Sequence, residues 1–192
     1  MNCPSITEIL PDSPRTLESE AEALERWGYQ RVLLAGHSFG GSISLIAVGR
    51  SDAIDAVIAT APAAYGSVQS NPWGYGLNAT GLYDLLGAVR HARVALFFFD
   101  GDIFDPGGRA PIADEILRTR GLAHLVIDRP AGLPTHWASI SPAFASQFGP
   151  CLVAFAADEP GSGALNCRDL EAAAQRTQVP ALSQLTSLPT RH

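Results

Sequence analysis

A serine flanked by glycines, in the GxSxG segment GHSFG at 36–40, has the clearest chemical meaning in this sequence. The segment stands between an apolar run at 31–36, which is typical of a buried strand, and a helical pattern at 40–50. A strand that turns directly into a helix strains the residue at the turn and lifts its side chain from the sheet. Ser38 is therefore predicted to be a nucleophile, with the Phe39 N–H and the helix N-terminus facing the developing negative charge. The alternative is that Ser38 only caps the helix.

A serine hydroxyl is a weak nucleophile, so it needs a base within hydrogen-bond reach and usually an acid that orients the base. His136 is the candidate base, because it follows the last predicted strand at the carboxyl edge, where α/β sheets place their sites. The other four histidines are less suitable. His37 is expected to point away from Ser38, His91 and His124 stand at strand entrances, and His192 is terminal.

The elements that must position these residues alternate along the chain. Apolar strand patterns occur at 31–36, 55–62, 93–99 and 123–130. Helical patterns occur at 13–28, 40–50, 81–92 and 110–121, and a further one at 136–148 is broken by Pro142. Strands that are apolar on both faces and alternate with helices indicate a three-layer α/β/α fold with a mostly parallel sheet.

The composition changes beyond about residue 157, where glycine, proline and polar residues become frequent. We therefore expect one catalytic domain at 1–157. A C-terminal tail at 158–192 follows, with a short helix near 169–176.

Three segments carry a resemblance to a known family: LLAGHSFGG, FFFDGDIFDP and PTHWA. On these motifs the chain resembles the α/β-hydrolase superfamily over residues 16–155, and dienelactone-hydrolase-like esterases in particular. The resemblance implies a catalytic triad in the chain order serine, acid, histidine. It also implies a serine esterase that cleaves a small carboxylic ester through an acyl-enzyme and needs no metal or organic cofactor.

The acid is expected in the turn after 93–99, which contains Asp100, Asp102 and Asp105. Members of the family often carry an aspartate followed four residues later by a proline, and Asp102 with Pro106 matches that pattern. Asp105 is the alternative acid, because an Asp-Pro pair is also common at this turn in the family. The aspartate that is not used is expected to be a turn former.

The substrate pocket is less clearly encoded. The segment at 71–83 is rich in aromatic residues and glycine, and the family inserts a lid or wall at this point. Trp73, Tyr75 and Trp137 are the candidate pocket residues, and packing of the loop onto the sheet is the alternative role for the first two.

The chain departs from the family before the serine, since only 37 residues precede Ser38 and the only strand pattern among them besides 31–36 is at 6–10. We expect either a fragment without its N-terminal strands, a strand supplied by a partner chain, or a minimal fold. If the strand order of the family holds, the strand at 31–36 loses one neighbour and becomes a sheet edge, through which the chain could form a homo-oligomer. A lost oxyanion donor would impair catalysis, so a weak catalyst or a non-catalytic binding module is the alternative function.

Charge and cysteine content limit the partners, the cellular compartment and the metal sites that we expect for this protein. The net charge of −6 without a basic run argues against a nucleic-acid partner. No apolar stretch reaches the length of a membrane span and no signal peptide is recognisable, so a soluble protein is expected. Cys151 and Cys167 are either a disulfide or two buried free thiols; a disulfide would favour a secreted or periplasmic parent protein. The cysteines have no spacing typical of a zinc site.

Overall fold

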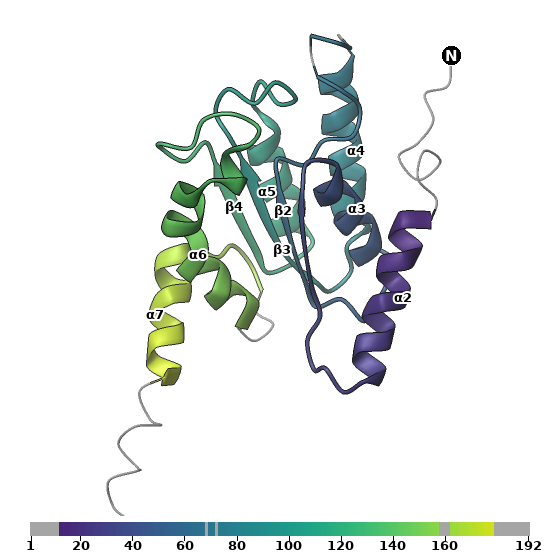
Figure 1. Ribbon diagram of the computed structural model, residues 1–192, viewed down its shortest axis with the longest axis vertical. Helices are drawn as coiled ribbons and strands as arrows, with labels where there is room; N and C mark the ends of the chain where they lie inside the picture. Colours follow the sequence, from purple (N-terminus) through teal and green to yellow (C-terminus); the bar gives the residue numbers. More distant parts are fainter. Residues whose placement is uncertain (1–11, 68, 72, 158–161, 179–192) are drawn as a thin grey trace, which may run out of the picture.

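The computed structural model describes residues 12–67, 69–71, 73–157 and 162–178. Over these residues it contains a parallel sheet in the order β1-β2-β3-β4 (Figure 1). The strands are β1 (Leu33–His37), β2 (Ala56–Thr60), β3 (Arg93–Phe98) and β4 (His124–Asp128). All four therefore end at one edge of the sheet, as the predicted mostly parallel arrangement requires.

Helices cover both faces of this sheet. One face carries α2 (Asp12–Arg26), α3 (Phe39–Val48), α4 (Gly74–Ala88) and α5 (Arg109–Thr119). The other carries α6 (Pro142–Ala157) and α7 (Cys167–Gln178), as Figure 1 shows. A short 3-10 helix, η1 (Ala138–Ile140), precedes α6, so the helical pattern at 136–148 is interrupted just before Pro142, as predicted. The three-layer α/β/α fold is confirmed.

The two central strands explain why the sheet forms. Every residue of β2 and β3 is buried. Successive side chains point to opposite faces, so Val57 joins the core under α2 to α5 while Ile58 joins the core under α6 and α7. In β3, Phe98 likewise joins the core under α2 to α5, and Phe97 joins the core under α6 and α7. Strands buried on both faces need mainly apolar residues, and the sequence supplies them at every position except Thr60 at the end of β2 and Arg93 at the start of β3.

Strand β1 is different, because within the described part of the chain only β2 pairs with it. Ala35 is exposed and the other residues of β1 are half-buried. Beside this edge is a groove of about 440 Å³ whose lining includes Leu17 of α2, Leu34 of β1 and Ile43 of α3. Self-association through this edge stays a prediction, and the strand pattern at 6–10 lies outside the described residues.

One expected segment is corrected by the structure. The sequence predicts a helix only from residue 81 and a lid or wall of the family at 71–83, but the helix begins at Gly74 as α4 and ends at Ala88. The side chain of Asn78 explains this, since its Oδ1 accepts hydrogen bonds from the backbone N–H groups of Ala64 and Tyr65. These contacts anchor the helix to the loop after β2 and override the weak helix propensity of its glycines.

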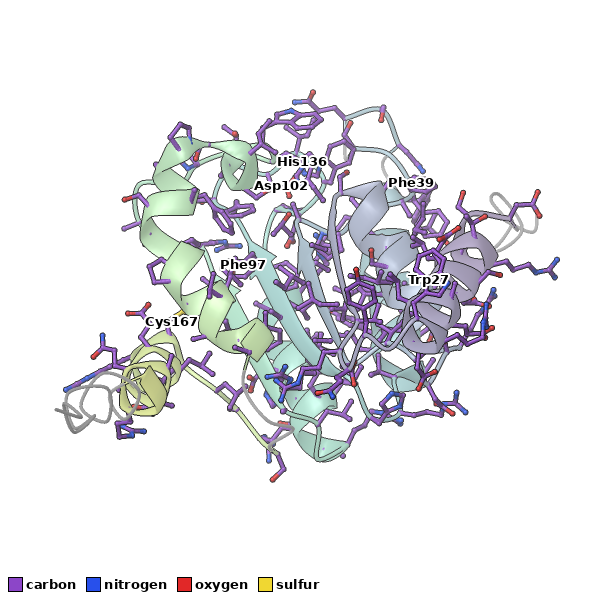
Figure 2. The ribbon with its side chains drawn as sticks, turned by 60° about the horizontal axis from the view of Figure 1, so that its bottom comes forward. Trp27, Phe39, Phe97, Asp102, His136 and Cys167 are labelled. Atoms are coloured by element: carbon purple, nitrogen blue, oxygen red, sulfur yellow. A yellow bond between two sulfur atoms is a disulfide. The ribbon has the colours of Figure 1, made fainter. Side chains whose placement is uncertain are left out.

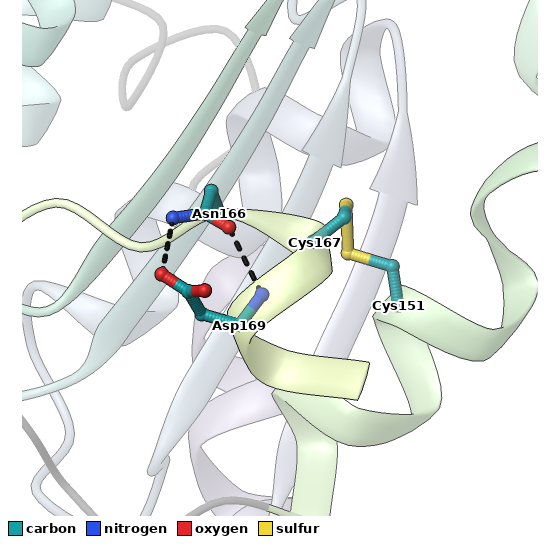
Figure 3. Close-up of a disulfide and its surroundings, with 4 residues drawn as sticks. All are labelled: Cys151, Asn166, Cys167 and Asp169. Atoms are coloured by element: carbon teal, nitrogen blue, oxygen red, sulfur yellow. Dashed lines mark hydrogen bonds between the residues drawn. A yellow bond between two sulfur atoms is a disulfide. The ribbon is translucent and has the colours of Figure 1, made fainter. Parts of the chain in front are cut away.

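The C-terminal helix is attached covalently. A disulfide joins Cys151 of α6 to Cys167 at the start of α7 (Figure 3). Asn166 caps α7, because its Oδ1 accepts from the Asp169 N–H at 3.0 Å and its Nδ2 donates to the Asp169 carboxylate at 2.7 Å. Leu170 is buried against the α6 side of the core. The division of the chain at residue 157 stays a prediction, and residues 179–192 lie outside the described part.

No helix in the described residues combines the length and apolar character needed to cross a membrane.

Candidate active site

The turn from β1 to α3 holds Ser38 in an unusual backbone conformation, with φ of 53° and ψ of −118°. A positive φ is uncommon for a residue with a side chain and persists only where the surroundings impose it. Here the Ser38 N–H donates to the Thr60 carbonyl at 2.9 Å, and the Ser38 carbonyl accepts from the Ala63 N–H at 3.3 Å. Both partners belong to the end of β2 and the loop after it. The strained turn predicted from the sequence is therefore present and is fixed by the neighbouring strand.

The glycines around this turn are not equivalent. A Cβ placed on Gly36 would lie 2.3 Å from the carbonyl oxygen of Gly40, so no side chain fits there. A Cβ on Gly41 would meet Ala59 of β2 at 3.4 Å, which shows how closely α3 approaches the sheet. A Cβ on Gly40 would meet nothing within 4 Å. Gly40 therefore avoids no collision at this turn, because that position faces open space.

Asp102 and His136 lie together at the carboxyl ends of the strands, with Phe39 at the start of α3 on the same side (Figure 2). Nδ1 of His136 is 3.0 Å from each carboxylate oxygen of Asp102, and both side chains are buried. The Phe104 N–H also donates to Asp102 Oδ1, at 2.8 Å, which fixes the carboxylate within its turn. The carboxylate therefore sets the orientation of the imidazole ring.

The opposite nitrogen of His136 is unoccupied. Its Nε2 is buried and has no hydrogen-bond partner among the described residues. A nitrogen in this state, on a ring oriented by a carboxylate, is what a general base requires. Phe39 is the first residue of α3, so its backbone N–H has no acceptor within the helix and is free to face an anion at the turn.

Asp105 has a different partner. One of its carboxylate oxygens lies 3.0 Å from Arg109 Nε, and the other accepts from the Gly107 N–H at 2.9 Å. Arg109 is fully buried and donates to the carbonyl of Pro62 at 2.6 Å. Asp105 is thus committed to an internal ion pair. The geometry favours Asp102 as the residue that orients His136.

Backbone strain is concentrated at the same edge of the sheet. In the described part of the chain, four residues other than glycine have positive φ: Ser38, Ala61, Arg129 and Thr135. The first three are the residues directly after β1, β2 and β4, and Thr135 directly precedes His136. Such conformations cost of order 1–3 kcal/mol each and gather at functional sites. In the described residues these conformations therefore gather at the carboxyl edge of the sheet, where the Asp102–His136 pair also lies.

His37 is a residue that the sequence argument set aside. Its ring lies 4.7 Å from the ring of His136 and 5.2 Å from that of Trp137. Burial lowers the pKa of His37 below its usual value, and the neighbouring His136 lowers it further, while Asp102 and a hydrogen bond at Thr60 act in the opposite direction. The net shift keeps this ring neutral near pH 7. Only its position beside Ser38 in the sequence pointed to it.

The predicted pocket residues are spread over this edge. Trp137 is 60% exposed and packs against His136, and Phe104 packs on the same ring at 4.4 Å. Trp73 is 79% exposed, just before α4. Tyr75 lies in the first turn of α4, where its hydroxyl donates to the Gly107 carbonyl at 2.6 Å. Their roles in substrate binding stay predictions.

No group of three or more His, Cys, Asp or Glu side chains within the described ranges is arranged to hold a metal ion.

Comparison with solved structures identifies the fold. Pyrococcus horikoshii acylaminoacyl peptidase superposes on 86% of this chain with a TM-score of 0.60 and 18% sequence identity. A second structure of that peptidase, without a ligand complex, covers 83% at a TM-score of 0.55 and 18% identity. A puromycin-hydrolysing peptidase of Mycobacterium tuberculosis covers 80% at a TM-score of 0.53 and 17% identity. The chain has the α/β-hydrolase fold.

The α/β-hydrolase fold is shared here at low identity, and the chain spans only 31%, 30% and 27% of the lengths of these three structures. No family model and no curated protein sequence matches the chain. In an α/β-hydrolase fold the residues of the triad follow one another along the chain in the order serine, acid, histidine. Ser38, Asp102 and His136 occupy the turns after β1, β3 and β4 in that order.

Proposed function

We propose that this protein is a serine hydrolase that cleaves a carboxylic ester, or a related acyl compound, through an acyl-enzyme on Ser38. The observation that carries the proposal is the buried Asp102–His136 pair, with its free Nε2, at the same sheet edge as the strained Ser38 turn. A helix cap alone would account for neither the strain nor the pair, and the side chain of Ser38 makes no cap hydrogen bond to α3.

The first half of the reaction forms the acyl-enzyme. Ser38 Oγ attacks the acyl carbonyl carbon, and His136 Nε2 takes the hydroxyl proton. Asp102 stabilises the imidazolium that results, because its carboxylate stays against Nδ1–H. The Phe39 N–H donates to the oxyanion of the tetrahedral intermediate. The intermediate then collapses, the bond to the leaving group breaks, and His136 passes its proton to the leaving oxygen.

The second half releases the acid. A water molecule gives a proton to His136 Nε2 as its oxygen attacks the acyl carbon on Ser38. The second tetrahedral intermediate expels Ser38 Oγ, which regains the proton from His136. The products are a carboxylic acid and the free enzyme. Every proton transferred in this scheme passes through one nitrogen, so no metal or organic cofactor is required by it.

Amides are the nearest alternative substrates. The structures that share the fold are named as an acylaminoacyl peptidase and a puromycin-hydrolysing peptidase. A chain with the same arrangement would cleave acylaminoacyl amides by the same two steps, with an amine as leaving group. A catalytically weak or inactive binding module is the second class of function, and the open edge of β1 is the observation that favours it.

The decisive experiment compares the wild type with Ser38→Ala on a short p-nitrophenyl ester and on an N-acylaminoacyl p-nitroanilide. Ser51→Ala is the matched control, because Ser51 lies beyond the other end of α3 and, among the described residues, its hydroxyl accepts only a local hydrogen bond from the Ala53 N–H. A fluorophosphonate probe, followed by peptide mapping, identifies the labelled residue. We expect labelling and turnover that disappear in Ser38→Ala and persist in Ser51→Ala. A folded wild-type chain that neither turns over nor labels would support the binding module instead.

The Cys151–Cys167 disulfide supports a place for the protein in an oxidising compartment, such as the periplasm or the cell exterior.

A further inference from the structure

A triangle of hydrogen bonds lies beside the Asp102–His136 pair. His37 Nδ1 is 3.1 Å from Ser139 Oγ and 3.2 Å from Thr60 Oγ1, and the Thr60 hydroxyl donates to Ser139 Oγ at 3.0 Å. These three residues come from different parts of the chain. His37 ends β1 next to the nucleophile turn, Thr60 ends β2, and Ser139 lies in η1, three residues after His136.

The protons of the triangle fit a neutral imidazole. With Thr60 donating to Ser139, the Ser139 hydroxyl is free to donate to an unprotonated His37 Nδ1. Nε2 of His37 is buried and has no hydrogen-bond partner among the described residues. In this neutral tautomer the ring proton is on that Nε2, and a positive charge would add a second N–H at Nδ1, where the Ser139 hydroxyl would lose its acceptor.

The surroundings of His37 also disfavour a role as the catalytic base. The groups that face it are Thr60 from β2, Ser139 and Trp137 from the η1 region, and His136 itself. The carboxylate of the site, Asp102, is bound to His136 rather than to His37. A histidine without a carboxylate partner is poorly placed to hold the proton of a serine.

The triangle joins two loops that have to be held in register. The separation in sequence is 102 residues between His37 and Ser139 and 79 between Thr60 and Ser139. Thr135, just before His136, is a β-branched residue at φ of 79°, so this loop is strained and depends on contacts at its ends. On one side the Thr135 N–H donates to the Asp100 carbonyl at 2.6 Å. On the other side Ser139 is held by His37 and Thr60.

We propose that His37 is a positioning residue: through Ser139 and Thr60, its neutral ring fastens the loop of His136 to the nucleophile turn of Ser38. The proposal rests on the proposed function, since it concerns how the base of that reaction is placed. Displacement of a catalytic group by about 1 Å costs on the order of 100-fold in rate. Loss of the triangle therefore lowers kcat and leaves KM nearly unchanged, because no member of it is required to bind substrate.

The test uses three variants at the triangle and one outside it, assayed on the p-nitrophenyl ester. His37→Leu replaces the imidazole with an apolar side chain of similar length, so that both ring nitrogens are removed. His37→Asn restores a polar atom close to the position of Nδ1. Ser139→Ala removes one hydroxyl. Ser141→Ala is the matched control, because its hydroxyl lies in the same turn but, within the described part of the chain, bonds only the Ala138 carbonyl and the Phe144 N–H.

We expect His37→Leu to lower kcat by about 100-fold and Ser139→Ala by about 10-fold, with KM within about twofold of the wild type. His37→Asn should recover most of the loss, and Ser141→Ala should keep the wild-type kcat although it removes a helix cap. The rate of fluorophosphonate labelling should follow kcat across the series. Urea midpoints recorded on the same samples separate misplacement from partial unfolding.

Two results overturn the proposal while the proposed function stands, provided that activity still depends on Ser38. The first is a wild-type kcat in both Ser139→Ala and His37→Leu. The second is a kcat of His37→Asn as low as that of His37→Leu. Activity and labelling that persist in Ser38→Ala would instead overturn the proposed function.

Discussion

His136 and Asp102 form a two-oxygen contact: the imidazole Nδ1 lies 3.0 Å from both oxygens of the carboxylate, and both side chains are buried. Three residues further along the same turn, Asp105 makes a buried ion pair with Arg109. Two aspartates of one short turn thus have different partners, and substitution of each should have a different consequence.

Asp102→Asn should lower kcat on the order of 10³- to 10⁴-fold with little loss of stability, because an amide N–H facing Nδ1 forces the ring into the wrong tautomer. Asp105→Asn should leave kcat of the folded protein within a few-fold. It should lower the free energy of unfolding by about 3–5 kcal/mol, since Arg109 would keep a buried, unpaired charge. Ester kinetics and urea unfolding of both variants check this. A large loss of kcat in Asp105→Asn alone would reverse the assignment.

Gly36→Ala should prevent folding or lower the free energy of unfolding by at least about 3 kcal/mol, because the new methyl group would meet the backbone of Gly40 at 2.3 Å. Gly40→Ala should change that free energy by no more than about 1 kcal/mol, since it enters a helix and meets open space. Thermal or urea unfolding of the pair provides the measurement. Equal destabilisation by the two substitutions would contradict the geometry of the turn.

The lowered pKa of His37 predicts a loss of stability on acidification. The unfolded chain takes up a proton on this histidine near its usual pKa of 6.5, while the folded chain takes it up only at lower pH. The contribution is therefore fully present above about pH 6.5 and is lost as the pH falls toward the folded-state pKa. Between about pH 7.5 and about pH 5, the unfolding free energy should decrease more in the wild type than in His37→Asn. If the unfolding free energies of the two proteins changed with pH in parallel, His37 would not contribute to the pH dependence of stability.

Reduction of the Cys151–Cys167 disulfide should lower the free energy of unfolding by about 3 kcal/mol, because the bond closes a loop with a sequence separation of 16. Ester hydrolysis by the folded protein should persist, since the bond joins α6 to α7 on the face away from α3. Unfolding with and without dithiothreitol measures the change. A variant with both cysteines replaced by serine should show no response to the reductant.

Much of the fold was predictable because the signals are local. Strands that are mainly apolar on both faces, together with helices that have a periodic apolar face, determine the alternation of elements, and the mainly parallel sheet follows from them. The extent of α4 was not predictable in this way. Its first turns contain Gly74 and Gly76, and they are held by Asn78 against a loop more than ten residues earlier in the sequence.

For the candidate site, the sequence by itself determined the types of residue and their order along the chain, because a strand, a glycine-flanked serine and a helix follow one another directly around Ser38. It also placed aspartates and His136 in the turns that end later strands. Only the tertiary structure decided which aspartate meets His136, because the pair is separated by 34 residues and two aspartates share the turn. Only the tertiary structure brought His37 against His136 and Ser139, since ring contacts and hydrogen bonds across about 100 residues depend on how the strands assemble, and no local pattern records them.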